Sequence, residues 1–278
     1  MAVQLVAQLP ADDLAARVER WLVHDGDIAP RIALLADDKE DLYWHAISDH
    51  FEPWIGVTHA AFAAHLASGR ARDRRLMVVH EDDRGPTLAT AAGWIASPLD
   101  RERWAAAQIA SLCDGISSMG TRHRGFVHRR AGDPRTFVDA GGNARLRAYL
   151  APGLFRADAG RGPFYVSPEQ ITLQLLTPAS DVFQLALTLY LALDGTHPFS
   201  RGEHGTDRLA SIVEDPTPPP PRTTSPQLGQ IIQLALAKRP EDRFHDPATF
   251  AAILRQHVPP VSTAVYDEVA SALRSARG

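Results

Sequence analysis

At 278 residues, with 45% hydrophobic and 22% charged residues, the chain has the composition of a globular protein and could form two separate cores. Its formal net charge of −4 creates no overall field that would attract nucleic acid or an anionic membrane, so neither is expected as a partner. The longest apolar run, Val182–Leu193, is too short to cross a bilayer, and the N-terminus does not resemble a signal peptide. A single cysteine, Cys113, excludes an internal disulfide and a cysteine-based zinc site, and it favours a reducing, cytoplasmic location.

The first third of the chain alternates short elements of both kinds. Pro10 followed by acidic residues predicts a helix over about 11–23, with an apolar face that includes Leu14 and Trp21. The segments "RIALLA" (31–36) and "DLYWHAIS" (41–48) are typical of strands, residues 56–70 of a helix, and "RRLMVVHEDD" (74–83) of a strand. This third therefore combines helix and sheet.

From Asp100 onward the sequence predicts mainly helices. The segment from Asp100 to Met119 carries one apolar stripe, and Val182–Leu193 is apolar all round, as in a buried helix. A proline-rich loop (215–226), the segment "QLGQIIQLALAKRPEDRF" (227–244) and a terminal helix from about Val261 follow. The change from mixed strands and helices to mainly helices places a domain boundary within 82–90, and the expected fold class is α+β.

The segment "GFVHRRAGDPRTFVDAGGNARLRAYL" (125–150) joins a His-Arg pair, a loop and two short strands separated by a glycine turn. Three further motifs follow in order: "VSPEQ" (166–170), "SDVFQLALTLYLALDGTHPF" (180–199) and "ALAKRPEDRF" (235–244). Together these segments resemble the C-lobe of a eukaryotic-like Ser/Thr protein kinase of the kind also common in bacteria. The resemblance implies a two-lobed kinase fold, with a small degenerate β-rich N-lobe at 1–83 and a mainly helical C-lobe at 84–278.

The same resemblance implies that the catalytic positions are degenerate. Arg130 stands at the catalytic-base position, Arg135 at the position of the metal-binding Asn, and Ala148 at the D-F-G aspartate. If "YWHAIS" is the strand that carries V-A-I-K, the lysine position is Ser48. No glycine lies between Gly26 and Gly56 to form a phosphate loop. The expectation is a pseudokinase with no cofactor and no metal, because the phosphate and magnesium ligands are missing.

Other residues match positions that hold a kinase C-lobe together. By resemblance, Glu169 and Arg243 form a buried pair, Asp181 binds the backbone of the catalytic loop, and His128 packs under that loop. Keeping both members of a buried pair favours an intact fold, since an unpaired buried charge is costly.

Three functions remain open from the sequence. The first is a scaffold or allosteric partner, with Arg124, Arg130, Arg135 and Arg147 forming a cationic cleft for an active kinase or for a phosphorylated or acidic segment. The second is a divergent enzyme that uses ATP for unorthodox phosphoryl or nucleotidyl transfer, with Asp133 as a displaced base. The third is a component of a larger assembly that the helix over 11–23 would contact.

Overall fold

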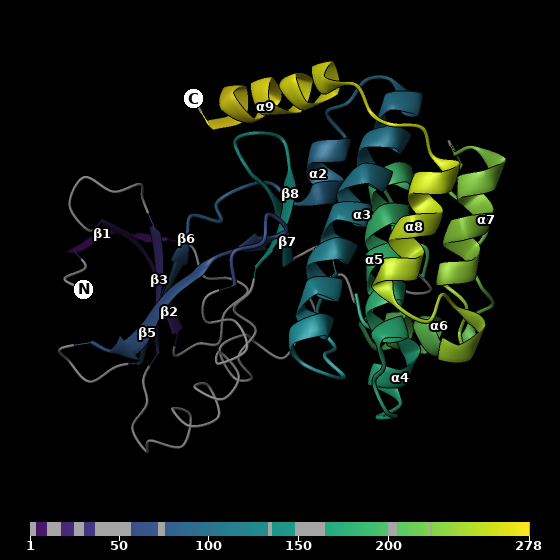
Figure 1. Cartoon of the computed structure of the whole chain (residues 1–278), viewed down its shortest axis with the longest axis horizontal. Helices are drawn as coiled ribbons and strands as arrows, with labels where there is room; N and C mark the ends of the chain where they lie inside the picture. Colours follow the sequence, from purple (N-terminus) through teal and green to yellow (C-terminus); the bar gives the residue numbers. More distant parts are fainter. Residues whose placement is uncertain are drawn as a thin grey trace. The chain divides into compact units, whose positions relative to one another are not determined.

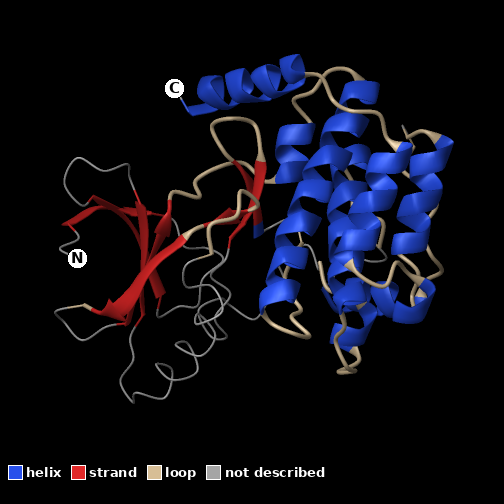
Figure 2. Cartoon of the chain, in the orientation of Figure 1, coloured by secondary structure: helices blue, strands red, loops and turns tan. Residues whose placement is uncertain are grey.

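The computed structural model describes residues 4–9, 18–24, 31–36, 57–71, 76–132, 135–147, 165–199, 205–222 and 224–277 (Figure 1). The described residues up to Asp83, together with Arg147, belong to one compact unit. Arg84–Leu146 and the described residues from Tyr165 onward form the other. In its described part the first unit contains strands and loops, whereas the second is largely helical (Figure 2). This is an α+β architecture.

The first unit is built on a five-stranded antiparallel sheet with the order β1-β2-β3-β6-β5. Its strands are β1 (Gln4–Leu9), β2 (Val18–His24), β3 (Arg31–Ala36), β5 (His65–Arg70) and β6 (Leu76–Glu81), and a short β4 (Phe62–Ala63) precedes β5. The strand β3 lies between β2 and β6, which suits its nearly continuous apolar sequence. Val23, Ala33 and Val79 form a fully buried cluster within this sheet.

Two predicted helices of this region are wrong. Residues 18–23 of the helix expected over 11–23 lie in β2, which pairs with β1 and β3, while residues 11–17 lie outside the described part. The helix expected over 56–70 is replaced, where described, by the strands β4 and β5. In both segments pairing with strands distant in sequence outweighs local helix preference. The strand expected at 31–36 is β3, and the one expected at 74–83 is present as β6 over 76–81, whereas the one expected at 41–48 lies outside the described residues.

The second unit is organised around two long helices, α3 (Pro98–Arg122) and α5 (Pro178–Asp194). The Ser97 side chain caps α3 by accepting the Asp100 N–H, and the fully buried Trp104 lies on its apolar face. Helix α5 is buried along almost its whole length and ends at Gly195, whose φ of 75° is the left-handed conformation that glycine adopts readily. The other elements are α2 (Leu88–Ala92), β7 (Thr136–Val138), β8 (Ala144–Arg147), α4 (Pro168–Ile171), α6 (Gly205–Glu214), α7 (Pro226–Ala235), a 3-10 turn η3 (Pro240–Asp242), α8 (Pro247–His257) and α9 (Thr263–Arg277).

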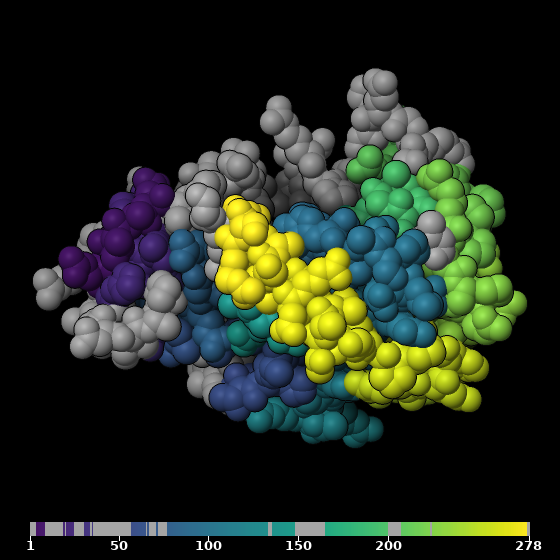
Figure 3. Space-filling model, turned by 90° about the horizontal axis from the view of Figure 1, so that it is seen from above, coloured from purple at the N-terminus to yellow at the C-terminus, as the bar shows by residue number. Residues whose placement is uncertain are grey.

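The terminal helix α9 packs on the second unit beside α2 and α3. Its Val265, Val269 and Leu273 are buried, and the space-filling view shows this C-terminal segment in yellow next to blue residues of the α2–α3 region (Figure 3). It also closes the β7–β8 turn, because a Cβ at Gly142 would lie 2.9 Å from the Tyr266 carbonyl oxygen. Among the described residues, no helix combines the length and apolar character needed to span a membrane.

Candidate functional site

The loop that follows α3 is hydrogen-bonded to Asp181 in the first turn of α5. One carboxylate oxygen accepts the His128 N–H at 2.7 Å and the other accepts the Arg129 N–H at 2.8 Å. Asp181 is fully buried, and burial raises the pKa of its carboxyl group to about 7, although the two backbone N–H groups favour the charged form. The His128 side chain is also buried. The structure thus shows the expected bonds from Asp181 to the loop backbone.

Two glutamines that the sequence analysis did not single out fasten the same loop. The Gln184 side chain accepts the Ala131 N–H at 2.6 Å and donates to the Arg129 carbonyl at 2.8 Å. Gln170, in α4, also donates to the Arg129 carbonyl, at 2.7 Å. The loop backbone is thus bound from α4 and α5 together, and neither glutamine carries a sequence signal of this role beyond its place in a matched motif.

A close packing contact fixes the end of this loop. A Cβ at Gly132 would lie 2.1 Å from the Tyr165 Cβ, a separation that real side chains do not reach. Tyr165 is buried and leads into α4. Only glycine therefore fits at position 132 without movement of the backbone.

The side chains of the loop present positive charge to solvent. Arg130, which the sequence analysis assigns to the catalytic-base position, is exposed, and so are Arg129 and Arg124. Arg129 has a φ of 69°, in the left-handed region that non-glycine residues seldom adopt. A guanidinium has five N–H donors and no acceptor, so Arg130 cannot take a proton from a hydroxyl group at any physiological pH.

The other two arginines of the predicted cationic cleft are engaged within the fold. Arg135 is 8% exposed. Arg147 Nε donates to the fully buried Asp83 carboxylate at 2.6 Å, and its Nη2 lies 3.3 Å from the Asp83 carbonyl oxygen. The predicted set is corrected accordingly: Arg124 and Arg130 face solvent, whereas Arg135 and Arg147 are largely withdrawn from it. The local sequence could not show this, because the partner of Arg147 lies 64 positions away.

Three positions to which the sequence analysis gave a phosphate, base or metal role lie outside the described residues. They are Ser48, Asp133 and Ala148. The third strand of the sheet, β3, has the sequence "RIALLA" and contains no lysine. Within the described ranges no group of three or more His, Cys, Asp or Glu side chains is arranged to hold a metal ion.

The buried pair that the resemblance implies is present. Arg243 Nη1 and Nη2 donate to Glu169 Oε1 and Oε2 at 2.8 and 2.9 Å, and the two side chains are 0% and 1% exposed. Burial opposes ionisation of Glu169, but the hydrogen bonds and charge of Arg243 outweigh it and hold the pKa of the carboxyl below its ordinary value. Arg243 also stacks on the Phe183 ring, 4.7 Å from its centroid. This bidentate pair joins α4 to the segment after η3.

The arrangement of helices and sheet matches a solved kinase domain along most of the chain. The PknI kinase domain of Mycobacterium tuberculosis, solved as a point mutant, superposes with a TM-score of 0.66 over 91% of this chain and 94% of that one, at 18% identity. The chain has a protein kinase-like fold. No protein-family model matches it.

Curated relatives of this kinase-like domain are bacterial Ser/Thr kinases. It is 32% identical to Mycobacterium tuberculosis PknD over 146 residues, which cover 49% of this chain and 21% of PknD. It is 42% identical over 132 residues to the Ser/Thr kinase drp72 of Corynebacterium efficiens, covering 45% and 25%. Mycolicibacterium smegmatis PknB matches at 27% identity over 165 residues, covering 54% and 26%. The matches thus span about a fifth to a quarter of the length of these relatives.

Proposed function

We propose that this kinase-like domain is a pseudokinase that binds a protein partner and does not transfer phosphate. The observation that carries the proposal is the exposed Arg130, in a loop whose backbone is held by the Asp181 carboxylate. Protein kinases place a carboxylate there to accept the proton of the substrate hydroxyl. A permanent cation at this position repels the proton and offers no lone pair.

The sheet supports the same proposal, because it lacks a lysine where a kinase binds the phosphates of ATP. Protein kinases carry the phosphate-binding lysine on their third strand. We assign the lysine position to Leu35 on β3, because "IALL" (32–35) fits V-A-I-K there, and this assignment replaces Ser48. Leu35 is 2% exposed and aliphatic, so its side chain cannot pair with phosphate. A site with this residue is not expected to hold Mg²⁺-ATP.

The retained contacts favour a folded binding module over a decayed remnant. Glu169 and Arg243 are buried and paired with each other, and the buried Asp181 accepts two backbone N–H groups of the loop. A buried carboxylate that loses its partner destabilises the fold, so these residues keep the loop surface in one shape. A fixed surface is what a scaffold or an allosteric partner of another kinase needs.

The alternative is a divergent enzyme that uses ATP for phosphoryl or nucleotidyl transfer. The similarity to proteins named as Ser/Thr kinases favours it, and Asp133 would serve as the displaced base. This function needs ligands for both phosphate and Mg²⁺. Leu35 can bind neither, and the guanidinium groups of Arg130 and Arg135 have no lone pair with which to coordinate Mg²⁺.

Thermal unfolding with ATP separates the two proposals. A ligand at a hundredfold excess over its Kd stabilises the folded state by about 2.7 kcal/mol. For a domain of this size that corresponds to a rise in Tm of about 5–10 °C. We expect no rise with millimolar ATP, with or without Mg²⁺. A Mg²⁺-dependent rise, together with transfer of labelled phosphate or nucleotide that Asp133→Ala abolishes, would replace the pseudokinase by the divergent enzyme.

A further inference from the structure

The helix α4 ends in an unusual way. The Thr172 N–H donates to the Pro168 carbonyl at 3.0 Å, and the Gln174 N–H donates to the Glu169 carbonyl at 2.9 Å. This second bond spans six residues, which is the pattern of a Schellman cap, and it places Leu173 at the position that glycine normally occupies. Leu173 accordingly has a φ of 56°, in the left-handed region where a Cβ is strained.

The strained residue gains nothing from burial. Its side chain is 92% exposed, and Leu175, two residues later, is 84% exposed. These are the two most exposed large apolar side chains in the part of the chain that the structure describes. Neither the backbone nor the core of the second unit explains a leucine here, and a backbone outlier with no structural benefit points to function.

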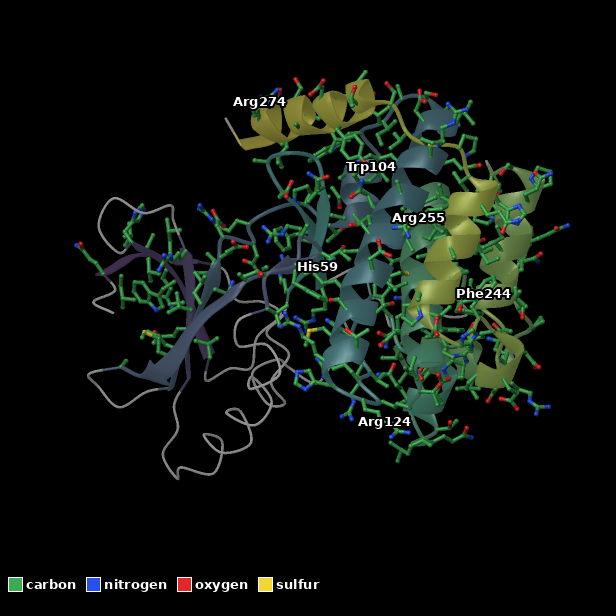
Figure 4. The ribbon with its side chains drawn as sticks, viewed as in Figure 1. His59, Trp104, Arg124, Phe244, Arg255 and Arg274 are labelled. Carbon is green, nitrogen blue, oxygen red and sulfur yellow. The ribbon has the colours of Figure 1, made fainter. Side chains whose placement is uncertain are left out.

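Exposed cations lie at the same end of the unit. The Gln170 side chain ties α4 to the Arg129 carbonyl, so the loop with Arg129 and Arg130 is adjacent to the helix that ends at Leu173. Figure 4 shows Arg124 at the α4 end of the helical unit. None of these three arginines forms an ion pair with a described residue. Glu169, the one acid within 120–132 and 165–177, is buried against Arg243.

We propose that Arg124, Arg129, Arg130, Leu173 and Leu175 form one docking surface, the Leu–Arg surface, for an acidic protein segment that also carries apolar side chains. The leucines would bury against the apolar side chains of the segment, and the guanidinium groups would bind its carboxylates. The inference rests on the proposed function, and it specifies the partner as a segment with both acidic and apolar side chains. A net charge of −4 and the lack of aromatic side chains in the patch make an anionic membrane the less suited occupant.

Selection from a displayed library of random 12-residue peptides, with the full chain as bait, tests this proposal. We expect enrichment of peptides that combine Asp or Glu with Leu, Ile or Phe. Their affinity should fall at least tenfold in the Leu173→Gly/Leu175→Ser variant and in the Arg124→Glu/Arg130→Glu variant. Glycine suits the left-handed φ at 173, so Leu173→Gly alone should keep or raise the Tm while it weakens binding.

Matched controls are available in the same unit. Leu234 is 47% exposed on α7, and Arg274 is exposed on α9, so Leu234→Ser and Arg274→Glu should leave peptide affinity unchanged. The proposal is overturned if no acidic-apolar peptide is enriched, or if enriched peptides bind all variants equally. It is also overturned if phosphatidylserine vesicles, but no peptide, bind the wild type and lose binding in the Leu173→Gly/Leu175→Ser variant. Peptide binding is measured without ATP, so a positive transfer assay would remove the pseudokinase proposal and leave this result unaffected.

Discussion

The Glu169–Arg243 pair allows a quantitative prediction about the stability of the helical unit. Glu169→Gln keeps the shape of the side chain but removes the charge that balances Arg243, whose side chain is 0% exposed. Removal of one member of a buried ion pair costs about 3–5 kcal/mol. Arg243 retains bonds to the carbonyls of Ala179, Ala237 and Lys238, which favours the lower end of this range. At about 2–4 °C per kcal/mol for a domain of this size, the Tm should fall by about 6–12 °C.

Circular dichroism at 222 nm during heating measures this effect, because the unit is mainly helical. The control is Glu241→Gln, which breaks the solvent-exposed pair with Arg239 and should leave the Tm unchanged. The pKa of Glu169 lies below its ordinary value of 4.5, so its stabilisation is present above that pH and is lost as the pH falls through the folded-state pKa. The Tm of the Gln variant should therefore approach that of the wild type in acid. A fall in Tm no larger than that of the control would refute the idea that this pair supports the fold.

Three other changes test the loop and the last turn of α3 before it. Asp181→Asn turns one acceptor into a donor facing a backbone N–H and should lower the free energy of unfolding by about 1–3 kcal/mol, measured by urea titration. Burial raises the pKa of Asp181 from 3.8 to about 7, so the stability of the wild type should decline as the pH rises from about 4 to about 7. If the Tm of the Asn variant changes with pH as steeply as that of the wild type, Asp181 is not the group responsible. Gly132→Ala should lower the stability by about 1–3 kcal/mol through overpacking against Tyr165. Gly120→Ala in α3, where a Cβ would meet nothing within 4 Å, should raise the stability by up to about 1 kcal/mol. Equal urea midpoints for the Gly132→Ala and Gly120→Ala variants would argue against the close contact between Gly132 and Tyr165.

The helical unit was largely predictable because its signals are local or recur as spaced motifs. The apolar stripe around Trp104 and the apolar run within α5 each identify a buried helix from the sequence alone. The partners Glu169 and Arg243 lie 74 positions apart, and only the resemblance to kinases connects them.

The sheet of the first unit was harder to predict. Val18–His24 follows an alanine-rich, acidic stretch that favours a helix, yet it becomes the strand β2 because β1 and β3 flank it. Contacts of this kind are absent from any short window of sequence. The same limit applies to the Arg147–Asp83 pair, which removed one arginine from the expected cationic cleft.

The cap of α4 also has an evolutionary consequence. A leucine in the left-handed conformation lowers stability relative to glycine, so selection for stability alone would replace Leu173 by glycine in one lineage after another. Its persistence would require a counteracting selection that acts on the side chain itself. Descendants of this protein that lose their partner should therefore accumulate glycine or asparagine at this position before they lose Glu169, Asp181 or Arg243, which the fold continues to need.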